Sequence, residues 1–574
     1  MELLIKRTLS IRSATSPRVG PRGAVYYLSD VTGVMQLWRF DGVVHDVVVP
    51  WEGRVGDFRV AGDGAVAVAT DVGGDEKWRI YIVDGDITPV STEGVNNLGA
   101  WSPDSQRLAF TSTRDDGQNF HLYLYDRFSG AVTKAAELPG INTAEEWSEA
   151  GIFVTHYETN FDSTIYWVRE GEVRELTKHA GEALNHSPKY VGDGRLLYLT
   201  NMDSEYVGIA QMDLSTGNWK YVVQLDRDVE LFDVWRDYLV FALNEGGASG
   251  LYYMHIPSGL THKIALPPGV VTSLQFRDGR VLLSLSGINR GHEIYTYQAG
   301  AVRRLTYSPR YGVELERIPD PESAWYESFD GRRIHANIYK PPGEAKGAVV
   351  YLHGGPESQD RPEFKPLVAA LLMAGFVVAA PNYRGSTGYG KTFVHLDDVE
   401  KRWDAVKDVE AFAKWLAEQG IATKKPCVMG GSYGGYLTLM ALAAAPHLWA
   451  CGVEIVGIFN LVTFLERTAP WRRKYREAEY GYLDKHRDVL TQLSPATHVE
   501  KIEAPLMIIH GANDIRVPVY EAEQLAQRLK ELGRRVEVII LPDEGHTISK
   551  VENRIKIYTE VVRFIRQHLE ASQH

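Results

Sequence analysis

Three residue types that together perform acyl transfer occur in the C-terminal part of the chain. Ser432 lies within residues 430–434 (GGSYG), which match the G-x-S-x-G pattern of a nucleophile elbow. Asp514 and His546 follow in the segments HGANDIRVP and PDEGH. A serine hydroxyl is a weak nucleophile at neutral pH, so it needs a base that takes its proton. We therefore expect Ser432 to be a nucleophile, His546 its base and Asp514 the group that orients the base.

The surroundings of Ser432 support this interpretation more than the five-letter pattern does. In a chain with 53 glycines the pattern alone is weak, and a plain glycine-rich turn is the alternative. However, residues 427–429 (CVM) are typical of a strand and residues 436–445 (YLTLMALAAA) of a helix. A serine on a tight strand-to-helix turn projects above the sheet, and the flanking glycines let neighbouring chains approach without a Cβ clash.

Asp514 and His546 also follow predicted strands, residues 506–510 and 536–541. The chain order serine, acid, histidine is that of a hydrolase sheet, and it brings the three side chains to one sheet edge. Asp543 and Glu544 are nearer to His546 in sequence, but we expect them to begin the loop. The expected role of Asp514 is to hold the imidazole tautomer and stabilise the imidazolium while staying ionised.

A tetrahedral intermediate needs two donors for its oxyanion. One should be the backbone N–H of Tyr433, directly after the nucleophile. The second should come from the glycine turn of residues 353–356 (HGGP), with Gly355 the expected donor. We expect His353 in this turn to pack the turn rather than to take part in catalysis.

The two halves of the chain follow different patterns. After Pro319, strands alternate with helices, which predicts a mostly parallel sheet covered by helices on both faces. Before it, seven units repeat, each with an apolar strand and then an alternating strand, as in AVYYLSD and MQLWRFDG. The period is about 41 residues, the spacing of four-stranded propeller blades. We predict an N-terminal segment (1–16), a seven-bladed β-propeller (17–318) rather than a β-sandwich array, and an α/β-hydrolase domain (319–574).

The composition and charge of the chain argue against some classes of binding partner. The chain has 574 residues and a net charge of −12, with no run of Lys or Arg that would follow a phosphate backbone, so we expect no nucleic-acid binding. No stretch reaches the roughly 18 apolar residues of a membrane span, and MELLIKRTLS lacks a signal-peptide core. We expect a cytoplasmic protein without cofactor or metal. Cys427 and Cys451 should be buried thiols, although pairing between neighbouring strands is possible, and an exposed edge strand could support a homo-oligomer.

The motifs together resemble a known family. HGGPE, PNYRGSTGYG, GGSYGGY, NDIRVP and DEGH, preceded by a repeat propeller, are similar to the prolyl oligopeptidase family of serine peptidases, and most of all to its acylaminoacyl-peptidase branch. The resemblance covers nearly the whole chain. It implies cleavage of short peptides, a propeller that restricts substrate size, a triad of Ser432, Asp514 and His546, and oxyanion donors Tyr433 and Gly355. It also implies Arg516 as a substrate contact or as a structural ion pair.

The resemblance leaves the cleaved bond open. Release of N-acylated amino acids would suit an apolar pocket, which aromatic residues of the insert 459–482 could supply, although they could equally pack the core. Glu145 and Glu146 could instead anchor a free amine, as in dipeptidyl peptidases, or be ordinary strand residues. A carboxylesterase with the same triad, or a binding propeller with an idle hydrolase half, would also be compatible with these motifs. Only residues 1–16 precede the first blade, where family members often have a longer helix.

Overall fold

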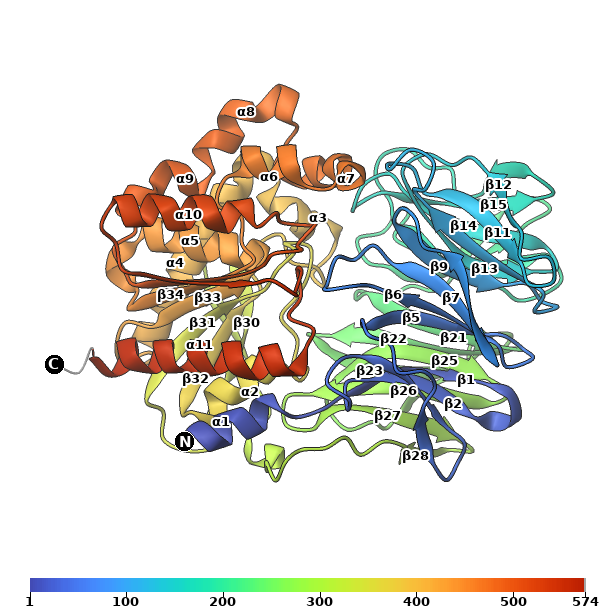
Figure 1. The fold of residues 1–574 in the computed structure, drawn as a ribbon, viewed down its shortest axis with the longest axis horizontal. Helices are drawn as coiled ribbons and strands as arrows, with labels where there is room; N and C mark the ends of the chain where they lie inside the picture. Colours follow the sequence, from blue (N-terminus) through green and yellow to red (C-terminus); the bar gives the residue numbers. More distant parts are fainter. Residues whose placement is uncertain (572–574) are drawn as a thin grey trace.

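The computed structural model describes residues 1–571, which form two halves lying side by side (Figure 1). One half is a ring of seven four-stranded sheets, and the other is an eight-stranded sheet with helices on both faces. The predicted fold class, a seven-bladed β-propeller followed by an α/β-hydrolase domain, is confirmed. The predicted boundaries stay a prediction, and the first strand of the propeller begins at Ala14, before residue 17.

Each blade consists of four consecutive antiparallel strands. The strands of blades one to four are β1 Ala14–Val19, β2 Val25–Ser29, β3 Gln36–Phe40, β4 His45–Val47, β5 Val55–Val60, β6 Val66–Thr70, β7 Arg79–Asp84, β8 Asp86–Ser91, β9 Asn96–Trp101, β10 Arg107–Ser112, β11 His121–Asp126, β12 Val132–Ala136, β13 Ile141–Ser148, β14 Gly151–Tyr157, β15 Ser163–Arg169 and β16 Glu172–Glu175. Blades five to seven contain β17 Asn185–Tyr190, β18 Arg195–Thr200, β19 Gly208–Asp213, β20 Trp219–Val223, β21 Val229–Trp235, β22 Tyr238–Glu245, β23 Ala248–His255, β24 Thr261–Ile264, β25 Val270–Arg277, β26 Arg280–Gly287, β27 Gly291–Gln298 and β28 Ala301–Arg304.

The second and third strands of every blade are the two strands that the repeat pattern located. They carry the pattern because they are buried between neighbouring blades, as in β2, where all five residues are buried. The fourth strands lie at the rim, and β16 is exposed along its whole length, so no apolar periodicity marks it. The first strands contact one another around the ring and surround its axis.

The ring closes without a strand shared between its ends, because blade one is built from β1–β4 alone. The seam to blade seven instead depends on side chains. The backbone N–H of Val19 donates to Gln275 Oε1 at 2.6 Å, and Val19 and Val25 pack with Leu282. Contacts of this kind replace the backbone ladder that would otherwise join the first and last blades.

The hydrolase sheet has the order β29-β30-β32-β31-β33-β34-β35-β36, and its strands are parallel from β32 onward. Its strands are β29 Glu322–Glu327, β30 Arg333–Tyr339, β31 Gly347–Leu352, β32 Phe376–Pro381, β33 Cys427–Gly431, β34 Cys451–Ile455, β35 Leu506–Gly511 and β36 Val536–Leu541. Its helices are α2 Pro366–Met373, α3 Lys391–Val394, α4 Arg402–Glu418, α5 Tyr433–Ala444, α6 Leu461–Arg467, α7 Pro470–Tyr480, α8 Leu483–Gln492, α9 Pro495–His498, α10 Tyr520–Glu531 and α11 Val551–Ala571.

Alternate residues of the buried strands face two separate apolar cores. In β31, Val350 and Leu352 pack toward α4 and α5, whereas Val349 packs toward α2 and α11. Helix α1 (Glu2–Leu9) joins the second core through Ile5 and Leu9 and lies against α2 and α11 (Figure 1). The short N-terminal segment therefore contacts the hydrolase half before the chain enters the propeller.

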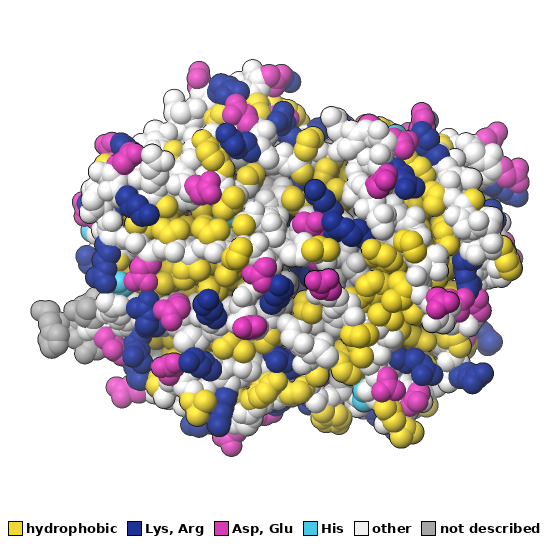
Figure 2. Space-filling view, in the orientation of Figure 1, with side chains coloured by type: hydrophobic (Ala, Val, Ile, Leu, Met, Phe, Trp, Pro, Cys, Tyr) yellow, Lys and Arg dark blue, Asp and Glu magenta, His cyan; other side chains and the backbone are white. Residues whose placement is uncertain are grey.

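Several composition-based expectations have a structural counterpart. Cys427 and Cys451 face each other on neighbouring strands as buried free thiols. Among the described residues, no helix has the length and apolar character needed to cross a membrane. Figure 2 shows acidic and basic side chains interspersed over the face in view, with apolar areas between them.

Candidate active site

Ser432 occupies a strained turn between β33 and α5. Its backbone has φ 56° and ψ −120°, a conformation that is costly for a residue with a side chain. The flanking glycines are required by close backbone contacts: a Cβ on Gly430 would lie 2.4 Å from the Gly434 oxygen, and one on Gly434 would lie 2.0 Å from the Leu352 oxygen. This is the backbone arrangement that the elbow pattern predicted.

Asp514 and His546 are in direct contact, although 32 residues separate them. Asp514 Oδ2 lies 2.7 Å from His546 Nδ1, while Oδ1 accepts the backbone N–H groups of Arg516 and Val517 at 2.9 and 3.0 Å. Burial by itself would raise the pKa of Asp514, but the charges and hydrogen bonds of His546 and His510 outweigh it and hold the pKa below its ordinary value. The carboxylate is thus ionised, as expected of a group that orients an imidazole.

Ser432 and His546 line the same cavity of about 260 Å³, together with residues at the start of α2 and in α11. No hydrogen bond joins the two side chains within residues 1–571. Such bonds are often loose without substrate and tighten in the complex. The structure therefore brings the predicted nucleophile, base and acid to one edge of the sheet, while their catalytic roles remain a proposal.

The two predicted oxyanion donors, Tyr433 and Gly355, lie at the start of α5 and in the glycine turn after β31. Tyr433 is the first residue of α5, where a backbone N–H has no acceptor within the helix. The glycine turn lies next to the nucleophile, since a Cβ on Gly354 would be 3.4 Å from the Ser432 Cβ. Gly355 has φ 116°, and its carbonyl accepts a long hydrogen bond from Tyr480 at 3.5 Å.

His353 is held by the turn. Its Nε2 lies 2.8 Å from Ser386 Oγ, and its ring stacks on Tyr383 with centroids 4.4 Å apart. Burial lowers the pKa of His353 to about 4, so the ring is neutral. These contacts fit the expected packing role.

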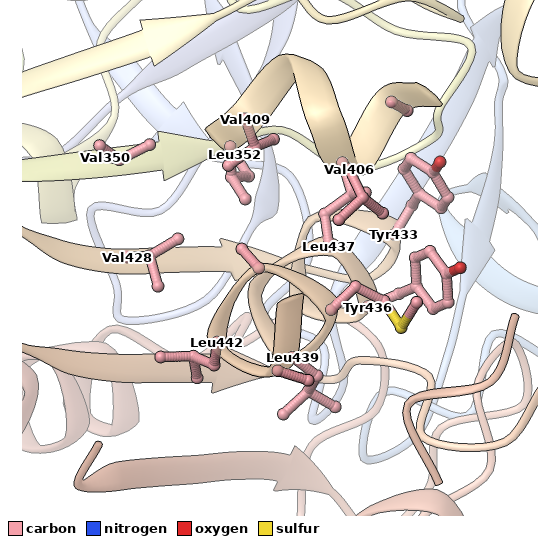
Figure 3. Packing of buried hydrophobic residues seen from close by; sticks show 14 of the residues in the cluster. Val350, Leu352, Val406, Val409, Val428, Tyr433, Tyr436, Leu437, Leu439 and Leu442 are labelled. Atoms are coloured by element: carbon pink, nitrogen blue, oxygen red, sulfur yellow. The ribbon is translucent and has the colours of Figure 1, made fainter. Parts of the chain in front are cut away.

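The side chain of Tyr433 packs into the hydrolase core behind the elbow. Figure 3 shows Tyr433 and Tyr436 at the end of an aliphatic cluster, with hydroxyl groups directed away from the aliphatic side chains. The Tyr433 hydroxyl donates to Asp397 Oδ2 at 3.0 Å, and the Arg402 guanidinium lies 5.1 Å from its ring centre. Sequence reasoning missed Asp397 and Arg402, because an isolated acid and base 5 residues apart have no distinctive pattern.

A loop of blade two, residues 71–78 between β6 and β7, packs directly on both catalytic loops. A Cβ on Gly74 would lie 2.4 Å from the Gly545 nitrogen, beside His546, and Asn513 donates to the Gly73 oxygen at 2.8 Å. Glu76 accepts from Arg516 Nε at 2.7 Å. The structure therefore shows Arg516 in an ion pair with the propeller, one of its two expected roles; a substrate contact stays a prediction.

The aromatic residues of the insert 459–482 lie in two different environments. Phe464 and Tyr480 pack in the hydrolase core near Tyr433. Trp471 and Tyr475 of α7 instead line a cavity of about 210 Å³ against blades three and four. Trp471 meets the edge of Phe120 there, with ring centres 5.4 Å apart. Core packing and a cavity lining therefore both occur in the insert, each through different residues.

Glu145 and Glu146 lie on β13, the first strand of blade four, and not on the hydrolase sheet that carries Ser432. They line a separate cavity of about 480 Å³ at the propeller axis, to which all seven first strands contribute. The other charged residues that line this cavity are Arg18, Arg59, Lys189, Asp233 and Arg277. Burial raises the pKa of Glu146 to about 7. Neither glutamate shares a cavity lining with Ser432 or His546.

With this geometry established, comparison with known proteins identifies the domain. Residues 362–572, which contain the elbow, the acid and the base, match the sequence profile of the prolyl oligopeptidase family. This segment of the hydrolase half is therefore similar to members of that family. Over the whole chain the fold resembles a chain from a structural study of two prolyl endopeptidases, with a TM-score of 0.89 and coverage of 99% of this chain and 91% of the other. The two are 18% identical, so this likeness concerns the fold.

Curated relatives of the prolyl oligopeptidase-type domain differ in their names. A segment of 247 residues is 34% identical to dipeptidyl peptidase family member 6 of Caenorhabditis elegans and covers 42% of this chain and 33% of that protein. A segment of 234 residues is 28% identical to acylamino-acid-releasing enzyme 1 of Oryza sativa subsp. japonica and covers 38% of this chain and 30% of that enzyme. The matches thus span about a third of the length of these relatives.

Proposed function

We propose that the chain is a serine peptidase that cleaves short peptides and releases N-acylated amino acids from their N-termini. The observation that carries the proposal is the contact between His546 and Asp514 in a family domain whose Ser432 occupies a strained elbow in the same cavity lining. Ser432 Oγ attacks the scissile carbonyl while His546 takes its proton. The N–H groups of Tyr433 and Gly355 stabilise the oxyanion, and His546 then protonates the leaving amine. Water then attacks the acyl-enzyme carbonyl while His546 takes its proton, and His546 returns the proton to Ser432 Oγ as the acyl group leaves.

Restriction to short substrates follows from the position of the propeller. The loop of residues 71–78 contacts the catalytic loops, and α7 contacts blades three and four, so the site lies against the propeller rather than on an open surface. A folded protein cannot reach a serine enclosed in this way, whereas a short peptide can. An idle hydrolase half would need none of this arrangement.

Preference for an acylated N-terminus rests on charge. A free amine needs a carboxylate that is not already neutralised, but Glu145 and Glu146 share their cavity with Arg18, Arg59 and Lys189. The aromatic face of α7, by contrast, offers Trp471 and Tyr475 to an uncharged group. The name of the nematode relative keeps dipeptidyl cleavage as the second candidate, with Glu145 and Glu146 as the amine anchor.

The deciding experiment is a substrate panel on the wild type and Ser432→Ala, containing acetyl-aminoacyl, free-amine dipeptidyl and internally blocked prolyl amides beside p-nitrophenyl esters. We expect preference for acetyl-aminoacyl amides and a fall in kcat of about 10⁶-fold in the variant. Ser258→Ala, at an exposed turn, is the matched control and should behave as wild type.

The remaining outcomes each point to a different activity. Preference for dipeptidyl amides would replace the acylaminoacyl assignment with the dipeptidyl one, and turnover of esters alone would indicate a carboxylesterase. Absence of labelling by a fluorophosphonate probe would indicate an idle hydrolase half. Cytoplasmic residence and the absence of nucleic-acid and membrane partners belong to the same proposal and rest on composition, whereas a homo-oligomer would form through an exposed edge strand.

A further inference from the structure

Three carboxylates converge behind the elbow. One oxygen each of Asp397, Asp398 and Glu479 lies within 4.8 Å of one oxygen of each of the others. Asp397 and Glu479 are fully buried, whereas Asp398 is partly exposed. Burying several negative charges together is costly unless cations compensate for them.

Each carboxylate uses one oxygen and leaves the other without a partner. Asp397 Oδ2 accepts from Tyr433 and Arg402, Asp398 Oδ2 contacts His395 at 2.7 Å, and Glu479 Oε1 accepts from Arg402 at 2.7 Å. Asp397 Oδ1, Asp398 Oδ1 and Glu479 Oε2 are buried and have no hydrogen-bond partner anywhere in residues 1–571. Arg402 thus pairs with the opposite oxygens of two carboxylates and leaves the remaining three oxygens unsatisfied.

The number of unsatisfied oxygens helps to decide whether a proton, a water molecule or a cation lies between the carboxylates. A shared proton joins two oxygens and leaves the third without a donor. A water molecule has two hydrogens, so it also leaves one of three acceptors unsatisfied. A cation, by contrast, can be coordinated by one oxygen from each of the three carboxylates at once, which their convergence allows. The carboxylate of Asp397 packs closely against the backbone of Gly385, because a Cβ there would lie 2.2 Å from Asp397 Oδ1.

We propose that Asp397, Asp398 and Glu479 hold a hard cation behind the elbow, in contrast to the expectation of a chain without metal. Ligands that are all oxygen select hard cations. Calcium is the first candidate, because it accepts irregular oxygen geometry, whereas magnesium demands a near-ideal octahedron and retains several waters.

The site would stabilise the residues beneath the oxyanion hole. An ion on Asp397 fixes the acceptor of the Tyr433 hydroxyl, and an ion on Glu479 fixes the partner of Arg402, whose guanidinium lies 4.5 Å from the Tyr480 ring centre. That consequence for catalysis rests on the proposed function. Ion binding itself does not, so the two can fail separately.

The test is calorimetric titration of the full chain, stripped with a chelator, with Ca²⁺ and in parallel with Mg²⁺ and Na⁺. We expect one Ca²⁺ per chain and a melting temperature that rises with free Ca²⁺. Asp398→Asn should weaken Ca²⁺ binding by more than about tenfold, because it removes one ligand charge. This position is the mildest of the three to change, since Asp398 is partly exposed.

Glu410→Gln is the matched control. This residue lies on α4, where its carboxylate pairs with Lys414 at 2.6 Å, and its substitution should leave Ca²⁺ affinity unchanged. Lack of binding of all three ions, with no change in melting temperature, would overturn the proposal. Ca²⁺ binding of equal affinity in wild type and Asp398→Asn would also overturn it, because the ion would then be bound elsewhere.

Discussion

Two groups of propeller carboxylates differ in what they contact. Glu145 and Glu146, adjacent in sequence, lie at the propeller axis among basic residues of the propeller itself. Glu76 is the acid of the blade-two loop that pairs with Arg516, two residues after Asp514. Its loop also contacts the backbone beside His546. The pair is the more conspicuous pattern, yet Glu76 is the one that reaches the catalytic loops, because spatial proximity rather than residue type decides the contact.

Among the variants that test this contrast, Gly74→Ala should have the largest effect on activity, because it separates the blade-two loop from the loops that carry Asp514 and His546. In Gly74→Ala the new Cβ would meet the Gly545 nitrogen, so the loop bearing His546 must shift. Misplacement of a catalytic group by about 1 Å costs about 100-fold in rate, and we expect kcat/KM to fall by about this factor. Steady-state kinetics on the best substrate of the panel measure it.

Gly85→Ala is the control for this change. Gly85 has φ 75°, close to the 76° of Gly74, but no atom lies within 4 Å of its would-be Cβ. It should therefore lose some stability and keep its activity. Equal activity of the Gly74 and Gly85 variants would show that the blade-two contact does not position the base.

A smaller effect is expected from the ion pair. Glu76→Gln removes the charge that holds Arg516 and should lower kcat/KM by about fivefold, equivalent to about 1 kcal/mol. A double-mutant cycle with Arg516→Met separates the two roles of the arginine. If Arg516 acts only through Glu76, the double variant should be no worse than either single one; an additional loss would indicate a substrate contact.

The smallest effect on activity should come from Glu146→Gln at the propeller axis. Burial raises the pKa of Glu146 from 4.5 to about 7, so between these values the folded chain binds a proton that the unfolded chain has released. Stability therefore falls as pH rises from about 4.5 to about 7 and stays lower above it. Glu146→Gln should remove this fall and raise the melting temperature above pH 7, with kcat/KM on acetyl-aminoacyl amides unchanged.

Glu172→Gln, on the exposed strand β16 of the same blade, should show neither effect. Loss of dipeptidyl activity in Glu146→Gln, with acylaminoacyl activity unaffected, would contradict the contrast between the two groups of carboxylates and make the axis the amine anchor.

Local patterns determined much of this protein. Alternating apolar residues located two strands of every blade, since these strands are buried between neighbours, and the glycines around Ser432 predicted the elbow because only glycine fits there. The apolar strands before Asp514 and His546 placed both residues at one sheet edge. Repeat position also placed Glu145 and Glu146 on a first strand, as the structure has them, whereas the fourth strands were not located, because an exposed strand such as β16 has no apolar period. Helix α4 begins at Arg402, whose buried guanidinium pairs with Glu479 of a distant segment.

Tertiary structure alone decided which residues support the site. Glu76 and Arg516 are 440 residues apart, and Asp397 and Arg402 meet Glu479 of a distant segment only beneath Tyr433. Sequence periodicity reports which face of an element is buried, because burial acts on each element separately. It does not report which loops meet, because that depends on how the propeller and the sheet pack together.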